Sequence, residues 1–136
     1  MNKIKLACLA TCLIGGIAQA ATPCDGFEVN VNNKLADNLI VTTIKLNGAD
    51  LQPGGIQKID AGSKQVFTVN KSTDGVPMKG TLVFHTLSVP SKEVKINFDL
   101  ENSGPVCQHS DTSPDSDYSV EKTRLPGKVD YTISNK

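Results

Sequence analysis

The stretch that decides the fold is Glu93-Val94-Lys95-Ile96-Asn97-Phe98-Asp99-Leu100, which alternates polar and apolar residues without a break. A period of two sends successive side chains to opposite faces of an extended strand, so the apolar set faces a core and the polar set faces water. An amphipathic helix would need a period near 3.6, which is absent here. The sequence therefore predicts a strand with one buried face.

The same alternation recurs over residues 27–32 and 128–133, near the two ends of the domain. Residues 38–46, 65–69 and 80–87 are less regular but rich in β-branched and aromatic residues, and 56–59 and 118–122 predict two short strands. Turn signals such as Asn47-Gly48 and Pro126-Gly127 separate these stretches. About eight strands at this spacing predict an all-β fold, a single antiparallel β-sandwich that is immunoglobulin-like or related.

The N-terminus has the three parts of a secretory signal peptide. Lys3 and Lys5 precede an apolar run over residues 6–18, and Ala18-Gln19-Ala20 supplies small residues for cleavage. The run is shorter than the roughly 20 apolar residues that a membrane-spanning helix needs. We expect a signal peptide over residues 1–20, a β-sandwich domain over 21–136, a secreted or periplasmic location and no transmembrane anchor.

Removal of the signal peptide would leave two cysteines of the four, Cys24 and Cys107. In an oxidising compartment two remaining cysteines most simply pair, so we predict one intramolecular disulfide; two free thiols are the alternative. The closed loop of about 84 residues gives roughly 4–5 kcal/mol in the chain-entropy model. Two cysteines cannot form a four-ligand zinc site, and we expect no metal and no cofactor.

Charge argues for a local binding surface. The chain has 14 basic and 14 acidic side chains, so loss of Lys3 and Lys5 leaves a slightly acidic domain, which excludes a nucleic-acid footprint. Cations do gather between residues 122 and 128, where Lys122, Arg124 and Lys128 surround Leu125 at the Pro-Gly turn. We predict that these four residues contact an anionic partner such as a lipid head group, with an exposed Leu125. An ordinary solvated hairpin is the alternative.

The two histidines do not form a recognisable catalytic set. His85 lies in a predicted strand and is interpreted as a residue on a sheet face. His109 lies in the polar stretch 108–117, interpreted as a solvated loop, with a cation site as the alternative. No Gly-x-Ser-x-Gly elbow is present. We therefore predict no catalytic residue and no enzymatic activity.

Generic sandwich features are shared with known secreted proteins. Leu46-Asn47-Gly48, Gly80-Thr81, Tyr118-Ser119-Val120 and the Pro126-Gly127 turn before the last strand follow one another in an order that resembles aegerolysin-type lipid-binding sandwiches, although Trp is absent. That resemblance implies a β-sandwich that binds lipid. The chain is also similar in kind to orphan substrates of Gram-negative type II secretion. Chaperone–usher pilins fit less well, because their cysteines lie closer together and their C-terminal motif differs from Ile133-Ser134-Asn135-Lys136.

These observations predict a secreted, non-enzymatic binding or interaction protein. It would be an exported bacterial effector or virulence factor that contacts a host membrane lipid or protein, with a protein, a glycan or an anionic lipid as partner. We expect it to be a monomer. Two alternatives stay open: a small secreted hydrolase with an Asp/His site at His109, and a periplasmic or surface structural subunit.

Overall fold

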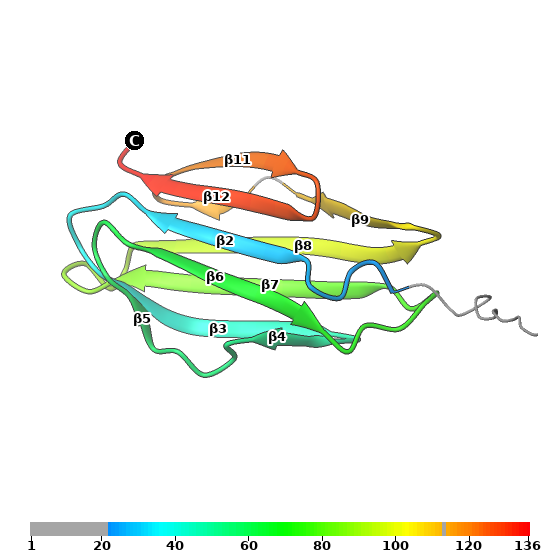
Figure 1. The fold of residues 1–136 in the computed structure, drawn as a ribbon. Coiled ribbons are helices and arrows are strands. Elements are labelled where there is room, and N and C mark those ends of the chain that lie inside the picture. The colour runs from blue at the N-terminus through cyan, green and yellow to red at the C-terminus, as the bar shows by residue number, and fades with distance from the viewer. Residues whose placement is uncertain (1–21, 113) are drawn as a thin grey trace, which may run out of the picture.

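The protein was examined as a computed structural model that describes residues 22–112 and 114–136. Eleven strands in this part of the chain form two sheets packed face to face, and no helix occurs there (Figure 1). The predicted all-β sandwich is confirmed, although the described residues form eleven strands where about eight were expected. The predicted signal peptide over residues 1–20 lies outside the described residues. Across those residues, no helix has the length and apolar character to cross a membrane.

One sheet follows the order β10-β8-β7-β3-β5, and β9 pairs with β8 along the same edge as β10. The register between β8 and β9 places Leu100 opposite His109. The strands of this sheet are β3 (Leu39–Asn47), β5 (Lys58–Ile59), β7 (Met78–Thr86), β8 (Glu93–Ser103), β9 (Val106–Asp111) and β10 (Asp115–Ser116).

The other sheet follows the order β11-β12-β2-β6-β4. Its β2 and β12 are parallel, with Val31 opposite Tyr131, whereas the other paired strands of both sheets are antiparallel within the described residues. No tight turn joins β2 to β12, so no hairpin fixes their direction. The strands of this sheet are β2 (Glu28–Asn33), β4 (Asp50–Gln52), β6 (Lys64–Asn70), β11 (Ser119–Leu125) and β12 (Lys128–Ser134).

The core lies between the sheets and confirms the predicted alternation. Along β8 every second residue is buried, from Val94 to Asn102, and the residues between them are exposed. Val129, Tyr131 and Ile133 of β12 are buried in the same way. The core is mainly aliphatic, as expected from a chain with four Phe, two Tyr and no Trp.

The predicted disulfide between Cys24 and Cys107 is confirmed, with an S–S distance of 2.06 Å. Cys24 precedes β2 of one sheet and Cys107 lies in β9 of the other, so the bond ties the two sheets together. The backbone N–H of Cys24 also donates to Asn102 Oδ1 at 2.7 Å. We call this the disulfide end; it also carries the β8–β9 turn and the β11–β12 turn, on the right of Figure 1.

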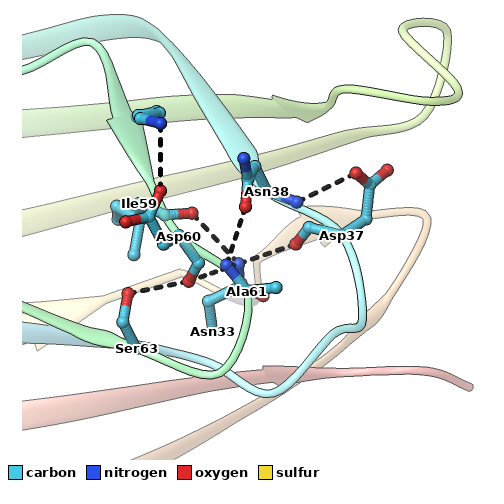
Figure 2. Close-up of polar contacts among 8 residues, drawn as sticks. Asn33, Asp37, Asn38, Ile59, Asp60, Ala61 and Ser63 are labelled. Atoms are coloured by element: carbon cyan, nitrogen blue, oxygen red, sulfur yellow. Dashed lines mark hydrogen bonds and ion pairs between the residues drawn. The ribbon is translucent and has the colours of Figure 1, made fainter.

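The opposite end is held by Asn33, the last residue of β2 (Figure 2). Its Nδ2 donates toward the carbonyl oxygens of Asp37 at 2.9 Å and of Ile59 and Asp60 at 3.2 Å. Its Oδ1 accepts from the N–H of Leu35 at 3.0 Å. One buried amide therefore joins β2, the β2–β3 loop and the β5–β6 turn. We call this the Asn33 end.

Candidate functional site

His109 is not in a solvated loop, and that interpretation of the stretch 108–117 was wrong. Residues 108–111 belong to β9, and the His109 side chain turns inward with 6% of its surface exposed. Its ring stacks against Phe27, with centroids 5.8 Å apart, and against Phe98, at 6.3 Å. The strand does alternate, since Gln108 and Ser110 are exposed and His109 between them is buried. The alternation is hard to see in the sequence because the buried residue is a histidine and not an apolar residue.

A glycine makes room for the aromatic ring next to His109. Gly80 lies opposite Phe98 in the register of β7 and β8. A Cβ atom at position 80 would lie 2.1 Å from Phe98 Cζ, well inside van der Waals contact. The absence of a side chain at Gly80 therefore fixes where the Phe98 ring can lie, and with it one wall of the histidine's pocket.

A chain of hydrogen bonds decides which nitrogen of His109 carries a proton. Lys122 Nζ pairs with Asp111 Oδ1, and Tyr131 Oη donates to Asp111 Oδ2 at 2.9 Å. The phenol has one hydrogen, so toward His109 Nε2, at 3.2 Å, it can only accept. Nε2 therefore holds the proton, and Nδ1 is a bare lone pair that is buried without a hydrogen-bond partner.

Burial keeps this network in a single protonation state near neutral pH. It lowers the pKa of His109; Asp111 opposes that shift, and the cations Arg124 and Lys122 reinforce it. Burial, followed by the charge of Asp111, raises the pKa of Tyr131. The ring of His109 is thus neutral and the phenol keeps the proton that it donates.

The predicted cationic cluster divides into two parts. Lys122, Arg124 and Leu125 lie on β11, and Lys128 begins β12 after the Pro126-Gly127 turn. Lys122 is neutralised by Asp111, whose side chain is 3% exposed. Arg124 and Lys128 form no ion pair with any residue that the structure describes. Leu125 is 43% exposed, as the sequence predicted.

Arg124 and Lys128 line a groove of about 490 Å³ between β9 and the β11–β12 hairpin. No Asp or Glu among the described residues lines it, so both charged lining residues are cations. A second hollow of about 530 Å³ shares Val106, Cys107, His109 and Arg124 with it and carries both signs of charge. The groove is lined by Pro23, Phe27, Pro105, Val106, Cys107, His109, Arg124, Leu125, Pro126, Gly127 and Lys128.

The groove combines cationic and apolar lining residues. Over residues 22–112 and 114–136, no group of three or more His, Cys, Asp or Glu side chains is placed to hold a metal ion. His109 is nine-tenths buried and its Nε2 already has a partner. Unpaired cations beside apolar side chains form a surface suited to an amphipathic anion. The sequence prediction included these cations but not the β9 wall that faces them.

Tyr131 and Asp111 were missed by sequence reasoning, although one signal could have indicated the first. Tyr131 occupies an apolar position of an alternating strand, and a buried phenol usually needs a hydrogen-bond partner. An inward tyrosine therefore predicts a polar side chain on the facing sheet. Nothing in the sequence marks Asp111 as that partner among the neighbouring aspartates.

Comparison with known proteins gives no family: neither a protein-family model nor a curated protein sequence matches the chain. Because many unrelated functions share the sandwich fold, its function has to be argued from the site itself.

Proposed function

We propose that the mature protein is a secreted, non-enzymatic binding protein whose disulfide end contacts an anionic membrane surface. The observation that carries this proposal is the groove in which Arg124 and Lys128, both without an ion pair among the described residues, lie beside apolar side chains. A negatively charged head group supplies the missing counter-charge. Each basic residue near an anionic surface contributes about 1 kcal/mol, so the attraction is weak and sensitive to salt.

Exposed apolar side chains at the same end support a membrane rather than a purely polar partner. Val106 is 55% exposed at the start of β9, Leu125 ends β11, and Val76 lies in the loop before β7. Apolar side chains beside cations can enter the boundary between head groups and acyl chains. The two contributions reinforce each other, because the cations hold the surface close enough for the apolar groups to insert.

The two alternative functions receive less support. A structural subunit needs an edge that accepts another strand, and the free edge of β11 carries Glu121, Lys122 and Arg124, which disfavour such pairing. A hydrolase that uses His109 as a base needs a ring that reaches its substrate. The ring of His109 is buried between aromatic side chains instead.

The test is sedimentation of the mature protein with vesicles that contain anionic lipid, at low and at physiological salt. The variant Arg124→Glu, Lys128→Glu is compared with Lys34→Glu, Lys64→Glu, which makes the same charge change on exposed lysines at the Asn33 end. We expect wild type and the control to bind at low salt and the groove variant to lose at least tenfold. Equal binding by both variants, or no binding by wild type, would overturn the proposal.

A further inference from the structure

We infer that the groove is a saturable site for one phosphate monoester with an apolar chain. The phosphate pairs with Arg124 and Lys128, which both line the groove, and the chain runs along its apolar side chains. This inference rests on the proposed function and makes it more specific, because it assigns a discrete one-to-one site within the membrane-facing surface.

Charge selects the phosphate. Both charged residues that line the groove are cations without an ion pair in the described chain, and a phosphate monoester carries about −1.5 to −2 at neutral pH. A carboxylate would neutralise only one of them. The planar guanidinium of Arg124 can also donate two parallel N–H bonds to phosphate oxygens, which adds geometric selectivity.

The contrast between Lys122 and Arg124 identifies the external site. These residues lie two apart on β11, so their side chains leave the strand on the same face. Lys122 meets a buried acceptor of the protein, Asp111, at a position opposite Tyr131. Arg124, opposite Val129, lines the groove and has no carboxylate partner in the described chain. The fold thus neutralises one cation and leaves the next for a ligand.

The remainder of the groove suits a chain. Its volume of about 490 Å³ falls in the usual range for small-molecule sites, roughly 300–1,000 Å³. Phe27 is almost fully buried, whereas Val106 and Leu125 are exposed. The aliphatic and aromatic part of the lining, which includes Pro23 and Pro126 as well, provides an apolar track next to the cations.

The walls are held in place before any ligand arrives. The disulfide fixes Cys107 on one wall, and the N–H of Glu28 donates to the carbonyl of Gly127 at 3.1 Å, which ties the hairpin turn to β2. A preorganised site loses little conformational freedom on binding, so a few contacts are enough for measurable affinity.

The experiment is calorimetric titration of the mature protein with decyl phosphate below its micelle concentration. Inorganic phosphate and the uncharged decyl maltoside test the two halves of the ligand separately. We expect one site, with binding at least tenfold weaker for either half alone and for Arg124→Gln or Lys128→Gln. Lys34→Gln, Lys64→Gln is the matched control and should bind as wild type does. Thermal melts verify that each variant is folded.

Three results would overturn the inference: no saturation, binding of inorganic phosphate as tight as decyl phosphate, or unchanged binding by the Arg124 and Lys128 variants. The result with vesicles is separable from these. Vesicle binding without a decyl phosphate site would mean diffuse surface attraction, which refutes the discrete site and leaves the proposed function standing. A decyl phosphate site without vesicle binding would refute the membrane function and support the site.

Discussion

The two ends of the sandwich treat their buried polar groups differently. At the Asn33 end both polar atoms of the buried Asn33 amide have backbone partners. Its Nδ2 donates toward the carbonyls of Asp37, Ile59 and Asp60 (Figure 2), and its Oδ1 accepts from the N–H of Leu35. At the disulfide end the buried amide of Asn102 is also paired, with Cys24 and Ser72, but His109 Nδ1 is buried without a partner. Asn30 Oδ1 of β2 is a further buried atom without one. Arg124 and Lys128 have no counter-ion among the described residues. Native proteins satisfy most buried polar groups, so an unsatisfied one needs an explanation.

The difference indicates a division of roles. The hydrogen bonds of Asn33 replace those that water would make to loop and turn carbonyls, and their contribution is to stability. The disulfide end is held by a covalent bond as well. The two sheets therefore stay together there even though some of the surrounding polar side chains have no hydrogen-bond or ion-pair partner. Unpaired groups cost stability, and they are retained most readily where a ligand uses them. The following predictions test this division, from the largest expected effect to the smallest.

Removal of the disulfide should have the largest effect. Cys24 and Cys107 are 83 residues apart, and replacement of both by Ser should lower the free energy of unfolding by about 4–5 kcal/mol, because the open chain gains conformational entropy. Urea unfolding of the oxidised wild type and the double variant measures the difference. If the bond were dispensable, with the Asn33 end sufficient to hold the sheets, the two transitions would have the same midpoint.

Replacement of Asn33 by Ala should come next, with a loss of about 3 kcal/mol. The variant leaves the buried N–H of Leu35 without its acceptor, and such a stranded group costs about 1–3 kcal/mol. It also removes the bonds to the carbonyls of Asp37 and Ile59, whereas the carbonyl of Asp60 still accepts from Ser63. Asn38→Ala is the matched control at the same end, because its Oδ1 accepts a single exposed bond from Ala61. A loss no larger than that of the control would show that Asn33 does not hold this end together. Ligand binding should be unchanged in both variants.

The sequence predicts the parts of this molecule that follow from local periodicity. The strand around Phe98 and the inward set of β12 could be assigned because their buried residues are mostly apolar. The cysteine pair could be assigned because removal of the predicted signal peptide would also remove Cys8 and Cys12, which leaves Cys24 and Cys107. The parallel pairing of β2 and β12 could not, since it joins residues about a hundred positions apart and no turn chemistry reports it.

The site was only half predictable for the same reason. Arg124, Leu125 and Lys128 are close in sequence, so their cluster is visible there. The opposite wall is β9, whose inward residues include Cys107, His109 and Asp111. In the sequence alone, His109 and Asp111 are typical of a loop. Their contacts with Tyr131 and Lys122 on the other sheet explain why both side chains are buried.

The smallest of the three effects should be a pH dependence that belongs to the disulfide end. The pKa of His109 is lower in the folded protein than its ordinary value near 6.5, so the unfolded chain binds the proton more readily. The stabilising contribution of the neutral ring is therefore complete above about pH 6.5 and is lost as the pH falls through the folded-state pKa. One proton limits the slope to about 1.4 kcal/mol per pH unit.

His109→Phe isolates this effect, because phenylalanine can stack on Phe27 and Phe98 but cannot titrate. Both proteins should carry His85→Gln, which leaves His109 as the one histidine able to titrate in the mature domain. At pH 7.5 the variant should lie within about 1 kcal/mol of its parent, since it loses one hydrogen bond to Tyr131 and removes an unpaired nitrogen. Urea unfolding between about pH 4.5 and 7.5 should show a fall in stability for the parent and a flatter profile for the variant. Parallel profiles would mean that His109 does not carry the acid sensitivity, and the unpaired nitrogen would then lose its significance for the contrast between the two ends.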